Sequence, residues 1–144
     1  MSQKPVSTVA VPQSVVSAEA VSVALEAAVA KAAELGVKIN VAVADSGGNL
    51  SGFLRMPGAF VQSIDIAIDK AYTAASFGLS TAQWVDLLED RGASNLRHVP
   101  RVMAAAGGFP IMEDGAIIGG IGISGGSWAQ DQEAGEEALR NFSK

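Results

Sequence analysis

The chain has no cysteine and only one histidine among its 144 residues. Without cysteine it cannot form disulfides, thiolate nucleophiles or cysteine-based metal sites, and one histidine cannot build a multi-histidine metal centre. Aromatic residues are also scarce, with two Trp, one Tyr and five Phe, so few side chains can stack on a flat cofactor. We therefore expect no metal site made of protein ligands.

Positive charge is sparse as well. The net charge is −5, the isoelectric point is near 4.7, and the lysines and arginines form no run. Binding to a nucleic-acid backbone needs a concentrated basic surface. A nucleic-acid partner is therefore excluded.

Long hydrophobic runs are missing too. No apolar stretch approaches the roughly 20 residues that a membrane-spanning helix needs. Within the first 17 residues, Ser7, Pro12, Gln13 and Ser14 interrupt the apolar core that a secretory signal would have. We expect residues 1–16 to form an N-terminal arm, and the protein to be cytoplasmic with no membrane contact.

The length and the hydrophobic fraction of 49% fit one domain over residues 1–144. Capping residues and apolar periodicity predict its elements. The expected helices are Ala18–Leu35, Val61–Phe77, Thr81 to about Asp90, and a last one from Trp128; the expected strands are Val37–Ala44, Leu50–Met56, Phe109–Glu113 and Ala116–Ser124; Arg91–Pro100 is an expected loop and Val102–Ala106 is left open. This order predicts an α+β sandwich, a central antiparallel sheet of about five strands flanked by helices.

The most distinctive stretch is rich in glycine and runs from Gly107 to Gly126. Glycines alternate with apolar residues in its second half. A glycine in a strand lets another backbone or a flat ligand approach closely. The stretch therefore predicts either a tight strand–helix contact or the floor of a pocket, and we take a pocket as the working hypothesis.

Two familiar motifs fit this stretch by letter only. Gly120, Gly122 and Gly125 match G-x-G-x-x-G, but they lie within the strand, and the remaining chain ends as a helix without the second strand of a dinucleotide site. Gly122, Ser124 and Gly126 match G-x-S-x-G, whose histidine follows the serine in hydrolases, whereas the histidine here precedes it. Neither site is expected.

The single histidine, His98, lies in the expected loop between two arginines. It is either a solvated surface residue, an axial ligand to haem or a corrinoid, or a general base. Met56, Met103 and Met112 are the other possible axial donors, and the alternative for each is packing in the core.

Two cations stand in positions where they could act together. Lys70 lies on the non-core side of the helix Val61–Phe77, and Arg55 lies near the end of a strand. This side is either a solvated face or, if Lys70 lies beside Arg55, an anion clamp for a carboxylate or propionate. The free N–H groups at the start of the last helix, near Ser124 and Gly125, would add a second anion contact.

Taken in order, these segments resemble the GlcG/HbpS-type proteins, also called the haem-degrading domain family. The resemblance covers about Ala18 to the C-terminus. Its motifs are Val41–Leu50, Arg55–Ala59, Ser63–Ala74, Gly107–Ile111 and Ile118–Gly125, with Asp131 following.

The resemblance implies a profilin-like fold that assembles as dimers or larger homo-oligomers. It also implies a loose function: some members bind haem and promote its breakdown, a related domain accompanies a corrinoid adenosyltransferase, and others lie in pathways that degrade small organic or aromatic acids. By their place in the motifs, Asp45, Gly108, Pro110 and Gly122 are implied as site residues.

Two functions remain open. We favour a cofactor-independent enzyme or binder for a small organic acid, such as a ring-cleavage metabolite of aromatic catabolism, that acts by hydrolysis, deamination or tautomerisation. Arg55 would anchor the carboxylate, and Lys70, Tyr72 or Asp45 would move a proton. Main-chain donors near Ser124 would hold an oxyanion.

The alternative is a haem- or corrinoid-binding module, in which the glycines accept the flat ring and Arg55 or Lys70 pairs with its propionates. In either case the partner is a small anionic molecule. A homo-oligomer is expected as well, because nearly half of the residues are apolar and one sheet edge is expected to be open.

Overall fold

The computed structural model describes residues 3–142, so Met1, Ser2, Ser143 and Lys144 lie outside the described part of the expected domain. Its elements are α1 (Ala18–Leu35), β1 (Asn40–Asp45), β2 (Leu50–Arg55), α2 (Ser63–Phe77), α3 (Thr81–Leu87), a 3₁₀ helix η1 (Ser94–His98), β3 (Gly108–Glu113), β4 (Ala116–Ser124) and α4 (Trp128–Arg140). The predicted α+β class is confirmed.

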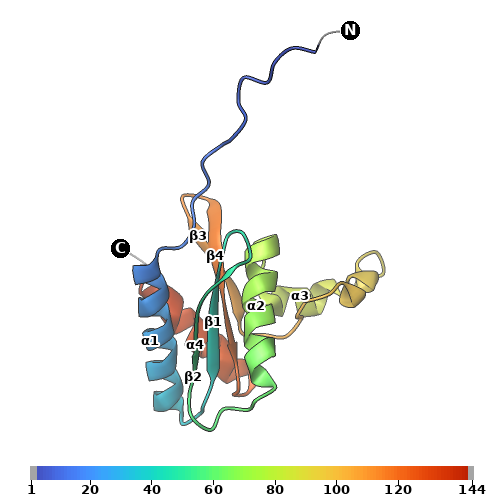
Figure 1. The fold of residues 1–144 in the computed structure, drawn as a ribbon. Helices are drawn as coiled ribbons and strands as arrows, with labels where there is room; N and C mark the ends of the chain where they lie inside the picture. The colour runs from blue at the N-terminus through green and yellow to red at the C-terminus, as the bar shows by residue number, and fades with distance from the viewer. Residues whose placement is uncertain (1–2, 143–144) are drawn as a thin grey trace.

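The strands form an antiparallel sheet in the order β2-β1-β4-β3. Helices α1 and α4 cover one face, and α2 packs on β4, β1 and β3 on the other face (Figure 1). The sheet has four strands within the described residues, so the expectation of about five was wrong. The order leaves β2 and β3 at the two edges.

The helix boundaries follow local capping signals. Ser17 caps α1, and Gly36 ends it in the left-handed conformation. Capping boxes open α3 at Ser80 and α4 at Ser127. Boundaries without such a signal differ by a few residues: α2 begins at Ser63, α3 ends at Leu87, and the expected loop contains η1.

The two faces of the sheet are packed with side chains of different size. Toward α1 and α4, β1 and β4 present Val41, Val43, Ile121 and Ile123, all fully buried. Toward α2 the buried cluster consists of alanines from β1 and α2. Small side chains on both surfaces bring α2 close to the sheet.

Gly120 and Gly122 on β4 make this approach possible. A Cβ atom at Gly120 would overlap the carbonyl oxygen of Ala71, and one at Gly122 would overlap that of Ala67. Of the two roles that the glycine-rich strand allowed, the structure shows tight strand–helix packing. The expected pocket floor is covered by the backbone of α2.

Among residues 3–142, no helix combines the length and the apolar character needed to cross a bilayer.

Replacing Gly122 with alanine tests this packing. Because the new methyl group would meet the backbone of α2, we expect Gly122→Ala to lower the free energy of unfolding by about 1–3 kcal/mol or more. Urea unfolding followed by circular dichroism measures the change. Gly92→Ala is the matched control, since its Cβ would meet only the Asp90 side chain, at 3.2 Å. Equal losses for the two variants would contradict direct α2–β4 contact.

Candidate functional site

Lys70, the expected catalytic base, lies on the buried side of α2, so the expectation that it stands on the non-core side of this helix was wrong. Its side chain is 2% exposed, and its Nζ atom donates to the carbonyl oxygen of Ile123 at 2.7 Å. Asp131 at the start of α4 lies 3.4 Å from the same nitrogen and is also buried. Lys70 therefore joins α2 to the end of β4 and to α4 on the other face of the sheet.

Burial controls the ionisation of this pair. Loss of hydration lowers the pKa of Lys70, and the charge and hydrogen bond of Asp131 offset part of that effect. Loss of hydration also raises the pKa of Asp131, against the opposing effects of the Lys70 charge and of N–H donors from Gly126 and Gly125. The pKa of Lys70 is thus lowered and that of Asp131 raised, and in each case contact with the partner opposes the shift.

The glycines around the pair leave space for it. Gly107 has φ +123°, and a Cβ there would lie 3.0 Å from Lys70 Nζ. Gly108 donates its N–H to Thr81 Oγ1 at 2.8 Å. Gly125 has φ +139°, and a Cβ there would lie 2.5 Å from Lys38 O. The predicted ligand-binding roles of Gly108, Gly122 and Gly125 stay predictions, while their observed contacts are within the fold.

Arg55 belongs to a different group. In the strand register it lies beside Asn40, which in turn lies beside Ser124. The Arg55 guanidinium donates to Ala59 O at 2.7 Å, whereas the Lys70 ammonium binds Ile123 O and Asp131. The two cations are thus engaged separately, and the expected anion clamp is not formed.

Asn40 is the polar residue in this group that the sequence interpretation missed. It is fully buried; its Nδ2 donates to Phe60 O at 3.1 Å, and its Oδ1 has no partner within the described residues. The available signal was an amide side chain between two β-branched apolar residues at the start of a strand. Asn40 therefore places an unpartnered amide oxygen on the strand residue next to Ser124.

The other predicted catalytic residues lie toward the opposite end of the sheet. Asp45 accepts N–H bonds from Gly47 and Asn49 in the β1–β2 turn. Burial alone would raise the pKa of Asp45, but these hydrogen bonds outweigh it and the pKa is lowered. The ring of Tyr72 carries the guanidinium of Arg101 at 3.6 Å. Asp45 and Tyr72 are therefore not brought to Lys70, and their catalytic roles stay predictions.

His98 ends η1 on a lobe that projects beyond α3 (Figure 1). We call residues 91–101 the η1 lobe. His98 is exposed, and within residues 3–142 its ring has no hydrogen-bond partner. The lobe also contains Arg91, Arg97 and Arg101, three of the ten basic residues of the chain. His98 is therefore a predicted site residue that is exposed and open to a ligand, as is the partly engaged Arg55.

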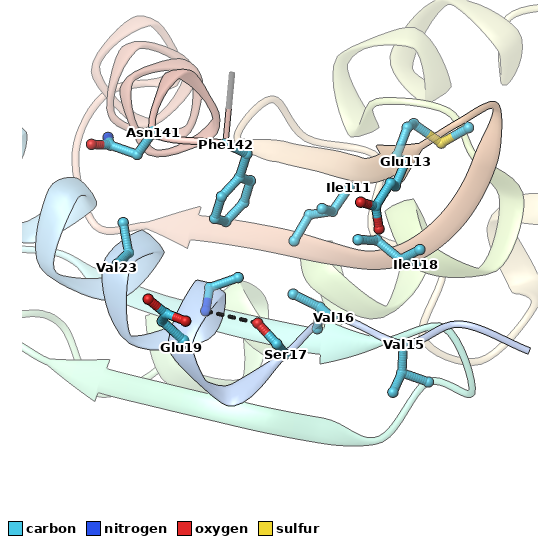
Figure 2. Close-up of a pocket in the computed structure, with 12 residues that line it drawn as sticks. Val15, Val16, Ser17, Glu19, Val23, Ile111, Glu113, Ile118, Asn141 and Phe142 are labelled. Atoms are coloured by element: carbon cyan, nitrogen blue, oxygen red, sulfur yellow. Dashed lines mark hydrogen bonds between the residues drawn. The ribbon is translucent and has the colours of Figure 1, made fainter. Parts of the chain in front are cut away.

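A groove lies on the other face of the molecule, between α1, the end of α4 and the β3–β4 hairpin (Figure 2). We call it the apolar groove; its volume is about 550 Å³. The side chains of Val16, Ile118 and Phe142 are among those lining it, and its charged residues are Glu19 and Glu113. A neighbouring hollow of about 260 Å³ includes Pro110, the one predicted site residue found there.

No group of three histidine, aspartate or glutamate side chains suited to a metal ion occurs in residues 3–142.

Comparison with known proteins identifies the family. The model of the family described as haem degrading protein HbpS-like matches residues 16–140, and the chain belongs to this family. It is 39% identical over 123 residues to an uncharacterized 15.0 kDa protein of the dhaT-dhaS intergenic region of Citrobacter freundii, covering 83% of this chain and 86% of that protein. It is 35% identical over 118 residues to the corrinoid adenosyltransferase PduO of Salmonella typhimurium, covering 78% of this chain but 34% of PduO.

Solved structures share the fold. A double mutant of HbpS from Streptomyces reticuli superposes with a TM-score of 0.89 and 31% identity, covering all of both chains. A structure of a PduOC–haem complex superposes with a TM-score of 0.83 and 30% identity, covering 90% of this chain and 96% of that one. The antiparallel sheet flanked by helices is therefore that of the HbpS family.

Removing the charge of Lys70 tests the buried pair. Lys70→Met leaves the Asp131 carboxylate without its counter-charge, so we expect a loss of about 3–5 kcal/mol in the free energy of unfolding at pH 7. The double variant Lys70→Met/Asp131→Asn should lose less than the sum of the single variants, because neither charge remains buried alone. Urea unfolding of all four proteins measures the coupling, and strictly additive losses would contradict it.

The same variant has an expected pH dependence. Without Lys70, the pKa of Asp131 in the folded state rises further above its ordinary value of 3.8. A carboxyl group whose folded pKa is raised above its unfolded value loses stability as pH rises from the unfolded pKa toward the folded pKa, and below the unfolded pKa it costs nothing. The deficit of Lys70→Met should therefore shrink as pH falls from 7 toward 4, and a deficit independent of pH would count against the pair.

Proposed function

We propose that this protein binds haem at the η1 lobe, with His98 as the axial ligand to the iron. The observation that carries the proposal is an exposed, unpartnered histidine within a segment that also holds three arginines. The description of the family and the haem complex of PduOC, 30% identical to this chain, support haem as the ligand class.

The side chains of this chain that could ligate haem iron supply one suitable axial donor. A neutral imidazole nitrogen is a common haem ligand, and His98 presents its ring to solvent. Met56 is less suitable, because its sulfur accepts the N–H of Ile39 at 3.4 Å. Met112 is half exposed, but it lies in the apolar groove on the other face. Met103 is partly buried, whereas His98 is exposed, so His98 is the donor we assign.

The charges of the η1 lobe fit the two propionates of haem. Arg97 is fixed to the lobe by hydrogen bonds to Ser94 O and Leu88 O. Arg101 lies on the Tyr72 ring and pairs with Asp69 at 2.9 Å on a partly exposed surface, and the ion pair is weak enough to exchange for another carboxylate. The apolar groove fits haem less well, because its charged residues, Glu19 and Glu113, would repel propionates.

Haem, when bound, supplies an iron centre for redox chemistry. The chain supplies the nitrogen donor of His98 and the arginine charges that orient the ring. Lys70 is buried and paired with Asp131, so we give it a structural role. The small-acid enzyme favoured by the sequence needs a cleft between Lys70 and the glycines of β4, and α2 occupies that position; haem binding is therefore the better-supported function.

Haem binding is tested by titrating the purified chain with hemin and following the Soret band. We expect saturation at one hemin per chain, and at least about tenfold weaker binding for His98→Ala with partial rescue by added imidazole, because the variant lacks the axial nitrogen. Asn95→Ala, an exposed neighbour on the same 3₁₀ helix, is the matched control and should bind as the unmodified chain does.

Two results would overturn the proposal. One is absence of hemin binding by the unmodified chain, and the other is equal affinity of the His98→Ala and Asn95→Ala variants. Titration with hydroxocobalamin distinguishes the corrinoid alternative: saturable binding of cobalamin and not of hemin would replace haem by a corrinoid as the ligand.

A further inference from the structure

The N-terminal arm, residues 3–15, extends away from the folded body (Figure 1). Its valines are strongly exposed, with Val6 at 73%, Val9 at 91% and Val11 at 75%. Apolar side chains in such a row are usually covered by another surface. The arm is therefore the most exposed apolar segment in the described chain.

The composition of the arm fits binding in an extended form. Between Pro5 and Ala18 it has no charged residue, so little charge would be desolvated on docking. Pro5 and Pro12 disfavour helix and favour extended backbone. Fully extended, residues 3–13 reach about 36 Å, long enough to cross the face of a second molecule.

The direction of the arm is fixed where it leaves the body. Val16 donates its N–H to Ile118 O at 2.9 Å, and Ser14 O accepts the hydroxyl of Ser46 at 2.8 Å. Val15 and Val16 then form one wall of the apolar groove (Figure 2). Because the preceding residues run away from this wall, the arm does not fill the groove of its own chain.

The apolar groove offers what an extended apolar segment needs. Ile111, Ile118 and Phe142 line it, and Met112 lines both it and the neighbouring hollow. The groove borders β3, an edge strand whose outer side pairs with no strand of the described chain. An extended peptide can bind such an edge through its backbone while its side chains enter the groove.

The charges at the apolar groove are complementary to the charge of the N-terminal arm. The charged residues lining it are Glu19 and Glu113, both acidic. The one charged residue in the described part of the arm is Lys4, which is basic. We propose that residues 3–13 of one copy of this chain dock in the apolar groove of a second copy, and that the second copy returns the same contact. Such a reciprocal exchange closes a two-fold symmetric dimer.

Disulfide trapping tests the contact directly, because the chain has no cysteine of its own. Val9→Cys is mixed with a size-tagged Met112→Cys protein under mild oxidation. We expect the mixed disulfide to exceed both homodisulfides severalfold. The control replaces Met112→Cys with Asp86→Cys, an exposed position on α3 at the opposite face. Equal mixed-disulfide yields from the two partners would overturn the proposal.

Arm variants test its role in assembly. We expect the dimer dissociation constant to rise at least tenfold when residues 1–13 are removed, or when Val6, Val9 and Val11 are changed together to serine. The body should still unfold cooperatively on heating, as in the unmodified chain. Lys4→Glu should weaken the dimer in the same direction. Light scattering after size exclusion measures the mass, and a monomeric unmodified chain, or an arm deletion with unchanged mass, would contradict the exchange.

A Val9→Cys/Met112→Cys double variant separates exchange from folding back. Exchange predicts disulfides between chains, which double the mass on a non-reducing gel. A disulfide confined to one chain would show that the arm occupies its own groove, and it would overturn the proposal. None of these readouts involves haem, so they stand apart from the test of His98.

Discussion

Helix α2 lies directly on the backbone of β4, because Gly120 and Gly122 have no side chain to hold it away. The contact places the alanines of α2 against those of β1, and it brings Lys70 to the end of the strand. There the ammonium group binds a main-chain oxygen and a buried carboxylate. This contact occupies the face of the sheet where a ligand was expected. The side chains that a ligand can reach therefore lie in the η1 lobe and in the apolar groove.

Most elements of the fold could be predicted because their signals are local. Ser17 and Gly36 mark the ends of α1 within its own sequence, and capping boxes do the same for the starts of α3 and α4. Periodicity identified the four strands that the sheet contains, and the count of about five was too high because the open segment Val102–Ala106 forms no strand. Boundaries such as the start of α2 moved where no capping side chain fixes them.

The site was less predictable, because its contacts join distant parts of the chain. Lys70 and Asp131 are 61 positions apart, and no local pattern reveals that they meet. A strand glycine also has the same sequence signature whether a ligand or a helix approaches it. The residue type, the loop position and the neighbouring arginines of His98 can be read from the sequence, but its exposure can be seen only once η1 is placed.

The fold thus has a closed interior and two open surfaces, the η1 lobe and the apolar groove. Hydrogen–deuterium exchange of the full chain with and without hemin tests this separation most directly. We expect slow exchange in α2 and β4 that hemin does not change, together with new protection in residues 91–101. Hemin-dependent protection centred on Gly119–Gly126 and Lys70 would contradict it, because the ligand would then enter the place assigned to α2.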